Sequence, residues 1–395
     1  MTSGAHRQGP LCGIRVIEMA GTQHGPVTFG GMILADMGAD VIRIDRPRVE
    51  ASAAHMAEDG PAGILGRGHR SIALDLKSPD AVDLARRLIE RSDVLIEGFR
   101  PGVMERIGLG PEDCLGRNAA LVYGRITGWG QTGPLAHTVG HDINYIALSG
   151  ALHTIGEKGG KPVVPANLVG DMGGGGIVLA LGVVAALLQA RISGKGQVVD
   201  AAMVDGAILQ MSAIFTMLET GTWQFERGSN LLDGGAPFYD TYECSDGRHV
   251  AVGAIEPPFY AALCRGLEIE HVLAHDQMDR ALWPDTKALI AERIRTKSMA
   301  EWLTIFEGTN ACVSPVLTLA EAAEHPHNRA RGNIVRRGGI RQPGVTPVFS
   351  ATPGAIVSGP PRIGRDGPAI LAEVGFTESD IAALVATGAV HVSPA

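Results

Sequence analysis

The chain has 395 residues, of which 45% are hydrophobic and 19% are charged, and its formal net charge is -8. This length exceeds what one compact core usually holds, so we expect two domains. The absence of a long basic run argues against nucleic acid as a partner. The longest apolar run, 177–188, is shorter than the roughly 20 residues of a bilayer span, which predicts a buried helix and no membrane partner.

The five cysteines are scattered along the chain, and no two of them form a C-x-x-C pair. Free thiols in a reducing compartment are the simplest interpretation of this pattern. The first residues, MTSGAHRQGP, lack the apolar segment of a secretory signal, and the last residues, HVSPA, match no targeting signal. We therefore expect a cytoplasmic protein.

The first part of the chain alternates short β-branched segments with helical patterns. The segment GIRVIEMA (13–20) is typical of a strand, and VTFGGMILADMGAD (27–40) has helical spacing. VIRIDRP (41–47) is a second strand that ends at Pro47. This order predicts a β-α-β unit with a parallel pair of strands.

The same alternation continues beyond this unit. The segment 78–92 is predicted to be a helix, with Ser78 as its cap and Pro79 at its first position. Further strands are expected at 71–76, 93–99 and 120–130. The motif GHDINY (140–145) is expected to open the next helix.

The glycine-rich segment NLVGDMGGGG (167–176) is predicted to be a loop that leads into a long apolar helix, a turn at SGKGQ and a strand. Residues 11 to about 205 therefore form an α/β fold, and we place the large domain at 11–225.

The pattern changes after about residue 225. A hairpin closed at Ser-Asp-Gly is expected first, then two helices, then a strand with a short helix. These elements are predicted at 235–255, 257–269, 286–307 and 311–327. They predict a second, smaller α+β domain at 226–330. Residues 331–395 are expected to supply a Gly- and Pro-rich connection and two short helices that return to the large domain.

Nine collinear motifs resemble the family III CoA-transferase group, specifically its α-methylacyl-CoA racemase branch. They are ADMGADVIRIDRP, GRGHRSIALDLK, TGWGQTGP, GHDINY, NLVGDMGGGG, GKGQVVDAAMVDG, NLLDGGAPFYDTYE, VAVGAIEP and ACVSPVLTLAEA. The resemblance implies a large Rossmann-like domain with a smaller α+β domain. It also implies an interlocked homodimer whose active site lies between the large domain of one chain and the small domain of the other.

The resemblance implies racemisation of 2-methyl-branched acyl-CoA thioesters at the carbon next to the carbonyl. This chemistry needs a base, an acid on the opposite face and stabilisation of an enolate oxygen. The family places the first proton-transfer group at His141, and imidazole titrates nearest neutrality. The second group is expected to be Asp171. No metal or separate cofactor is expected, because coenzyme A enters as part of the substrate.

Two further carboxylates lie in the motifs around these groups. Asp142 follows His141 directly, and neighbours on a helix do not face each other, so we expect Asp142 to cap the helix or bind backbone amides. The family takes the carboxylate that orients His141 from AIEP, which is Glu256 here. A glutamate before Pro257 is extended, and it could fix the tautomer of the imidazole.

The environment of Asp171 has opposing effects on its carboxyl group. Free N–H groups at the start of a glycine-rich helix favour the ionised form. Burial beside an acyl chain favours the protonated form, and we expect burial to dominate once substrate fills the pocket. The same N–H groups are candidates to bind the enolate oxygen.

Coenzyme A brings phosphates and an adenine. The resemblance assigns the adenosine end to Arg46 and to the segment Leu74, Asp75, Leu76 and Lys77, and Arg100 in GFRPG is a further candidate. It also assigns substrate contacts to the whole GHDINY motif: Gly140, His141, Asp142, Ile143, Asn144 and Tyr145. The family usually has lysine where this chain has His69, so a fixed positive charge is missing there.

Several alternative interpretations are open from sequence alone. Asp171 is also a favoured helix cap, Glu256 a possible surface ion pair, and Arg46 a possible partner of Asp45. The glycines at 173–176 could serve only close packing. The pair His271 and His275 has helical spacing, but no third metal ligand is evident.

Two other functions compete with the racemase. In a CoA-transferase of the same fold, the aspartate matching Asp171 attacks the thioester and forms an anhydride; transferases generally lack the histidine of GHDINY. A non-enzymatic acyl-CoA-binding protein would need no acid/base pair.

Overall fold

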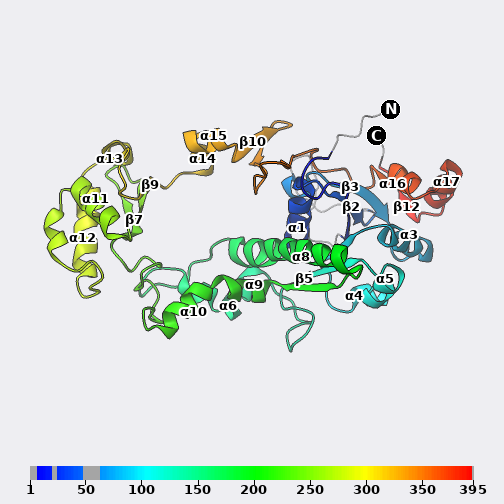
Figure 1. The fold of residues 1–395 in the computed structure, drawn as a ribbon, viewed down its shortest axis with the longest axis horizontal. Helices are drawn as coiled ribbons and strands as arrows, with labels where there is room; N and C mark the ends of the chain where they lie inside the picture. Colours follow the sequence, from blue (N-terminus) through cyan, green and yellow to red (C-terminus); the bar gives the residue numbers. More distant parts are fainter. Residues whose placement is uncertain (1–6, 20–24, 48–62, 394–395) are drawn as a thin grey trace. The chain divides into compact units, whose positions relative to one another are not determined.

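The computed structural model describes residues 7–19, 25–47 and 63–393, which form two compact units. The first unit comprises the described residues up to Ser149, 166–210 and those from His327 onward. The second comprises 150–165 and 211–326. The sequence predicted domain boundaries at 225 and 330; by packing, the second unit runs from 211 to 326 and also takes in 150–165. Figure 1 shows the elements of both units.

The first unit is built on a seven-stranded sheet in the order β12-β3-β2-β1-β4-β5-β6. All neighbouring strands run parallel except β12, which pairs antiparallel with β3. The strands are β1 (Arg15–Met19), β2 (Asp40–Asp45), β3 (Arg70–Leu74), β4 (Val94–Glu97), β5 (Val122–Thr127), β6 (Val198–Ala202) and β12 (Val390–His391). The predicted α/β class is confirmed, with a mixed central sheet.

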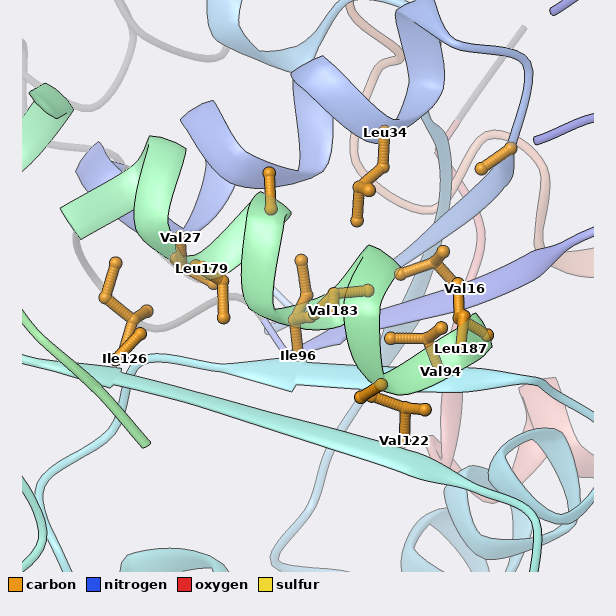
Figure 2. Packing of buried hydrophobic residues seen from close by; sticks show 14 of the residues in the cluster. Val16, Val27, Leu34, Val94, Ile96, Val122, Ile126, Leu179, Val183 and Leu187 are labelled. Atoms are coloured by element: carbon orange, nitrogen blue, oxygen red, sulfur yellow. The ribbon is translucent and has the colours of Figure 1, made fainter. Parts of the chain in front are cut away.

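The two faces of this sheet are covered by helices, so the strands are apolar on both sides. One face packs against α1 (Gly25–Asp36) and α8 (Val178–Ser193). Figure 2 shows Val16, Val94, Ile96, Val122 and Ile126 on the strands meeting Val27, Leu34, Leu179, Val183 and Leu187 on the two helices. The other face packs against α3 (Pro79–Glu90), α5 (Pro111–Arg117) and α16 (Gly367–Glu373).

Shorter elements complete the first unit. They are η1 (Ile64–Gly66), α4 (Val103–Arg106), α6 (Asp142–Leu148), the π-helix η2 (Leu168–Ile177), α9 (Met203–Gln210), β10 (Ile334–Arg337), β11 (Ile340–Pro343) and α17 (Glu378–Ala386). The helix predicted at 78–92 is confirmed, with extended Ser78 at its cap and Pro79 at its first position. Helix α6 starts where the GHDINY motif predicted a helix.

The second unit holds the three-stranded sheet β7 (Tyr239–Glu243), β8 (His249–Gly253) and β9 (Val313–Pro315). The predicted hairpin is confirmed, because β7 and β8 pair antiparallel and Gly247 in the turn has φ 72°. The helices of this part are α7 (Ala151–Thr154), α10 (Ser212–Glu219), α11 (Pro257–Leu267), η3 (Glu270–Ala274), α12 (Trp283–Ile294), α13 (Met299–Phe306) and α14 (Leu319–Glu324). The chain then returns to the first unit through α15 (Pro326–Arg331).

Three sequence predictions of elements are wrong. The helix predicted at 286–307 is two helices, because Ser298 and Glu301 form a capping box that starts α13. The predicted connection after residue 330 contains the hairpin β10-β11, which turns at Gly338 and Gly339, both with positive φ. The glycine-rich segment predicted to be a loop is the π-helix η2, which runs directly into α8.

The combined helix Leu168–Ser193 is, within the described residues, the one helix long and apolar enough to cross a membrane by length and composition. Only 44% of its most apolar window is buried. One side of α8 therefore forms the core shown in Figure 2, while another side carries apolar side chains that are exposed among the described residues.

Candidate functional site

Three cationic side chains follow strands β2, β3 and β4 of the sheet, in which β1 lies between β2 and β4. Arg46 comes directly after β2, Lys77 lies three residues after β3, and Arg100 lies three residues after β4. All three are exposed, and within the described part of the chain none forms a side-chain hydrogen bond or ion pair. Carboxyl ends of parallel strands share one edge, and ligands of such sheets bind there, where the strand order reverses. Here the order reverses between β1 and β4.

The alternative interpretation of Arg46 as a partner of Asp45 does not match the structure. Asp45 is buried, and its carboxylate forms an ion pair with Arg43 Nε at 2.8 Å and accepts a hydrogen bond from Ser71 Oγ. Arg46 points to the surface instead, so its charge is available to an anionic ligand.

The other residues assigned to the adenosine end are less exposed. Leu74 is fully buried in the core beneath α3, and Leu76 packs against the same core. The N–H of Asp75 donates to the carbonyl of Ala389 at 3.2 Å. Coenzyme A contacts of Leu74, Asp75 and Leu76 stay predictions, and Leu74 could make one only through its backbone.

His69, where the family usually has lysine, does not lie at the surface. Its side chain is fully buried, with Nε2 3.0 Å from Glu18 Oε2 and Nδ1 3.0 Å from the carbonyl oxygen of Arg67. The residue precedes β3, so it lies at the amino end of that strand. Histidine in place of lysine at this position therefore does not remove a positive charge from the carboxyl edge of the sheet, which carries Arg46.

Hydrogen bonds within the GHDINY motif hold the backbone of His141, which is the N-cap residue of α6. The N–H of His141 donates to Asn144 Oδ1 at 3.0 Å, and the Tyr145 hydroxyl donates to the carbonyl of Gly140 at 2.5 Å. The Tyr145 ring is buried and meets Trp129 edge to face at 4.8 Å. The imidazole itself is exposed, so the backbone of His141 is fixed while its ring faces outward.

A glycine on either side makes room for the Tyr145 ring. A Cβ at Gly128 would lie 2.0 Å from the ring, and one at Gly140 would lie 2.8 Å from it. Gly128 follows the last residue of β5, so this packing places the start of α6 at the carboxyl end of that strand. Ile143 is exposed on the first turn, and its predicted substrate contact, like those of Gly140, Asn144 and Tyr145, stays a prediction.

Asp142 connects the two proposed proton-transfer groups. Its side chain is buried, and Oδ1 accepts a hydrogen bond from the N–H of Asp171 at 2.7 Å. The prediction that Asp142 binds a backbone amide is thus confirmed. Its Oδ2 is buried with no partner among the described residues.

Asp171 lies in the first turn of η2, a helix type that is frequent at functional sites. Burial raises the pKa of Asp171, Asn167 lowers it through a hydrogen bond to Oδ2 at 3.3 Å, Asp142 raises it and His141 lowers it. The net pKa is raised above the ordinary value of aspartate, and burial is the largest cause. Asn167 was not predicted from the sequence, although its four-residue spacing to Asp171 was a usable signal.

The glycines after Asp171 serve close packing. A Cβ at Gly174 would lie 2.8 Å from the backbone N of Ala207, and one at Gly176 would lie 2.6 Å from the ring of Phe29. They let η2 lie directly against α9 and α1. The N–H of Asp171 is already bonded to Asp142, so that amide does not bind an enolate oxygen in this arrangement.

Glu256 lies in the second unit, at the N-cap of α11, with extended backbone. Its carbonyl accepts from the N–H groups of Phe259 and Tyr260, and its side chain is exposed. Its predicted role in orienting His141 stays a prediction. The open face of the nearby sheet carries a hollow of about 490 Å³, lined by residues that include Tyr239, Thr241, Ala251, Cys312 and Ser314.

CoA-transferase family III matches residues 11–367 of this sequence. The chain belongs to this family. It is 46% identical to the α-methylacyl-CoA racemase of Mus musculus and 45% identical to that of Homo sapiens, over 94% of this chain and 95% of each relative. A CaiB/BaiF family protein from Brucella suis has a solved structure that matches with a TM-score of 0.77 and 26% identity, over 93% of this chain and 100% of that one.

A buried ion pair that the sequence did not predict lies near the carboxyl edge of the sheet. We call this edge, which carries Arg46, Lys77 and Arg100, the cationic edge. Glu97, the last residue of β4, accepts a hydrogen bond from Arg125 Nε on β5 at 2.7 Å. Burial raises the pKa of Glu97 to about 7, although Arg125 and the N–H of Phe99 lower it. The available signal was one charged residue in each of two otherwise apolar strands, since a buried charge is costly unless it is paired. Among the described residues, no three or more His, Cys, Asp and Glu side chains form a group that could hold a metal ion.

Proposed function

We propose that this family III protein racemises 2-methyl-branched acyl-CoA thioesters by moving a proton on and off the carbon next to the carbonyl. The single observation that carries the proposal is the linked pair His141 and Asp171, joined through Asp142, in a chain 45–46% identical to two α-methylacyl-CoA racemases. One of the two groups removes the proton and the other returns one to the opposite face.

The surroundings of the two groups fit these roles. The raised pKa of Asp171 increases its protonated fraction at neutral pH, which an acid that donates to carbon requires. His141 is exposed and held by its backbone, so its ring can face a substrate that enters from solvent. We propose that Glu256, from the small domain, orients the imidazole.

The cationic edge supports coenzyme A as the carrier of the acyl group. Arg46, Lys77 and Arg100 are exposed and unpaired among the described residues, and coenzyme A brings several phosphate oxygens. Arginine binds phosphate with two parallel hydrogen bonds, and lysine binds it as a point charge. We propose that these three side chains bind the phosphates.

A test with one thioester distinguishes the racemase from a CoA-transferase that works through an Asp171 anhydride. The purified protein is incubated in deuterated water with (R)-2-methylacyl-CoA and no acceptor acid. We expect deuterium at the α-carbon together with loss of optical purity, because the abstracted proton exchanges with solvent. A second incubation adds a carboxylic acid as acceptor, and transfer of coenzyme A to that acid, without exchange in either incubation, would establish the transferase instead.

We further propose a Rossmann-like large domain and an interlocked homodimer. The six parallel strands follow the order 3-2-1-4-5-6, which is that of dinucleotide-binding sheets. Ile177 and three residues of α8, Leu181, Leu188 and Ile192, are each more than half exposed. Their spacing places them along one side of the helix. An exposed apolar stripe of this kind typically marks a protein interface.

The dimer gives a direct prediction. Replacing Leu181 and Leu188 together by glutamate is expected to turn a dimer into a monomer, because charges cannot be buried in an apolar interface. Sedimentation equilibrium measures the mass, and Gln189→Glu, an exposed polar position on the same helix, is the control. A monomeric wild-type protein, or a wild-type protein that sediments with phospholipid vesicles, contradicts the prediction.

A further inference from the structure

Glu97 lies immediately before the loop 98–102, which carries Arg100. Its carboxylate is completely buried, and both of its oxygens are used. Oε2 accepts a hydrogen bond from the N–H of Phe99 at 2.7 Å, and Oε1 accepts one from Arg125 Nε at 2.7 Å. The first bond fixes the direction in which the chain leaves β4, one residue before Arg100.

Arg125 holds the far end of the same loop. Its Nη1 donates to Glu105 Oε1 at 2.8 Å, and Glu105 lies on α4, the helix that begins directly after the loop. Gly102, at the end of the loop, has φ 82°, so the chain turns sharply there into α4. The guanidinium of Arg125 is therefore the common partner of one carboxylate before the loop and one after it. Arg100 lies between these two attachments.

Stability alone does not account for this arrangement. Burying two opposite charges costs several kcal/mol per ion in desolvation, and a well-packed apolar pair at the same place is often as stable or more stable. Glu97 and Arg125 are direct cross-strand neighbours on β4 and β5, where apolar side chains would continue the core. What the pair adds is a fixed backbone for the loop, because the two carboxylate oxygens accept from the Phe99 amide and from the arginine at the same time.

We propose that Glu97 and Arg125 are positioning residues for coenzyme A: they fix loop 98–102 so that the Arg100 side chain meets a phosphate at the carboxyl edge of the sheet. The inference rests on the proposed function, because it takes coenzyme A as the ligand of that edge. It assigns no contact with the ligand to Glu97 or Arg125 themselves.

The test measures the affinity of free coenzyme A by titration calorimetry and the steady-state kinetics of the thioester. Glu97→Gln keeps the shape of the side chain but replaces one of its two acceptor oxygens by an NH2 donor, so we expect the Kd of coenzyme A and the KM to rise about tenfold. The kcat is expected to stay within about twofold, since the acid/base groups are untouched. Glu90→Gln, at a surface ion pair with Arg117, is the matched control and is expected to change neither constant.

A double-mutant cycle distinguishes positioning from a general loss of structure. Arg100→Ala alone should weaken coenzyme A binding, and Glu97→Gln added to Arg100→Ala should weaken it no further. Additive effects would overturn the proposal, as would an unchanged Kd in folded Glu97→Gln or a fall in kcat with KM constant. If Glu97→Gln does not fold, Arg125→Lys is used instead. It keeps the positive charge but lacks the planar guanidinium that binds both carboxylates, so it must raise the Kd in the same way. Failure of the wild-type protein to bind coenzyme A would instead contradict the proposed function.

Discussion

Replacing His141 or Asp171 by alanine is expected to lower α-proton exchange at least about 100-fold in each case, as loss of a positioned acid or base does. Neither group has a substitute at its position. The neighbour of His141, Asp142, uses Oδ1 to bind the N–H of Asp171, and Asn167, beside Asp171, does not titrate. Exchange into deuterated water at saturating thioester measures the effect on turnover.

The control for this experiment is His137→Ala, which removes an exposed histidine from the loop before α6 and should leave exchange unchanged. The pH dependence adds a second check, because the pKa of Asp171 is raised chiefly by burial. In the direction in which Asp171 donates the proton, the rate should fall as pH rises through that pKa. In the direction in which Asp171 is the base, the rate should fall as pH decreases through it. Exchange at the wild-type rate in both alanine variants would remove the two assignments.

The fold was readable from sequence where local signals agreed. Pro79 after Ser78 predicted the start of α3, and β-branched segments predicted the parallel strands, because periodicity and capping are local properties. The segment after Asp171 was not readable. Four consecutive glycines favour a loop on their own, but here they allow a helix to lie against two others at distances that no Cβ permits. That preference comes from tertiary contacts, which a single sequence does not display.

The sequence predicted which residues form the candidate site, but not the contacts that join them. His141 and Asp171 stood out because the motifs around them resemble a known family, and the same resemblance assigned Arg46 and Lys77 to coenzyme A, with Arg100 as a further candidate. The connection through Asp142 joins positions 29 residues apart, and the pair of Glu97 with Arg125 joins positions 28 apart. Such pairs depend on strand order and helix packing, so they require the folded chain.

The second large effect concerns stability. Replacing His69 by alanine is expected to lower the free energy of unfolding by about 3–5 kcal/mol, because it leaves a buried carboxylate without its partner. Glu18 is completely buried, and Gly31 on α1 leaves room for the pair, since a Cβ there would lie 2.1 Å from Glu18 Oε2. Thr28 Oγ1 donates to the other oxygen at 2.7 Å and cannot supply a charge. Urea unfolding at neutral pH measures the change.

The pH dependence of this loss shows whether an unpaired charge causes it. In the wild-type protein burial alone would raise the pKa of Glu18, but His69, with Arg43 and Thr28, brings it below the ordinary value. Glu18 therefore stabilises the fold above its unfolded pKa, and that contribution is lost as pH falls through the lower, folded pKa. Without His69 we expect the balance to reverse: burial then raises the pKa of Glu18, so the variant should regain stability relative to the wild type as pH falls and Glu18 becomes neutral.

Adding Glu18→Gln to His69→Ala should recover much of the loss at neutral pH, because no charge is then buried. His153→Ala, at an exposed histidine, should change stability by no more than about 0.5 kcal/mol. A cost at His69 that is independent of pH and unaffected by Glu18→Gln would mean that packing, and not the charge of Glu18, makes this position necessary.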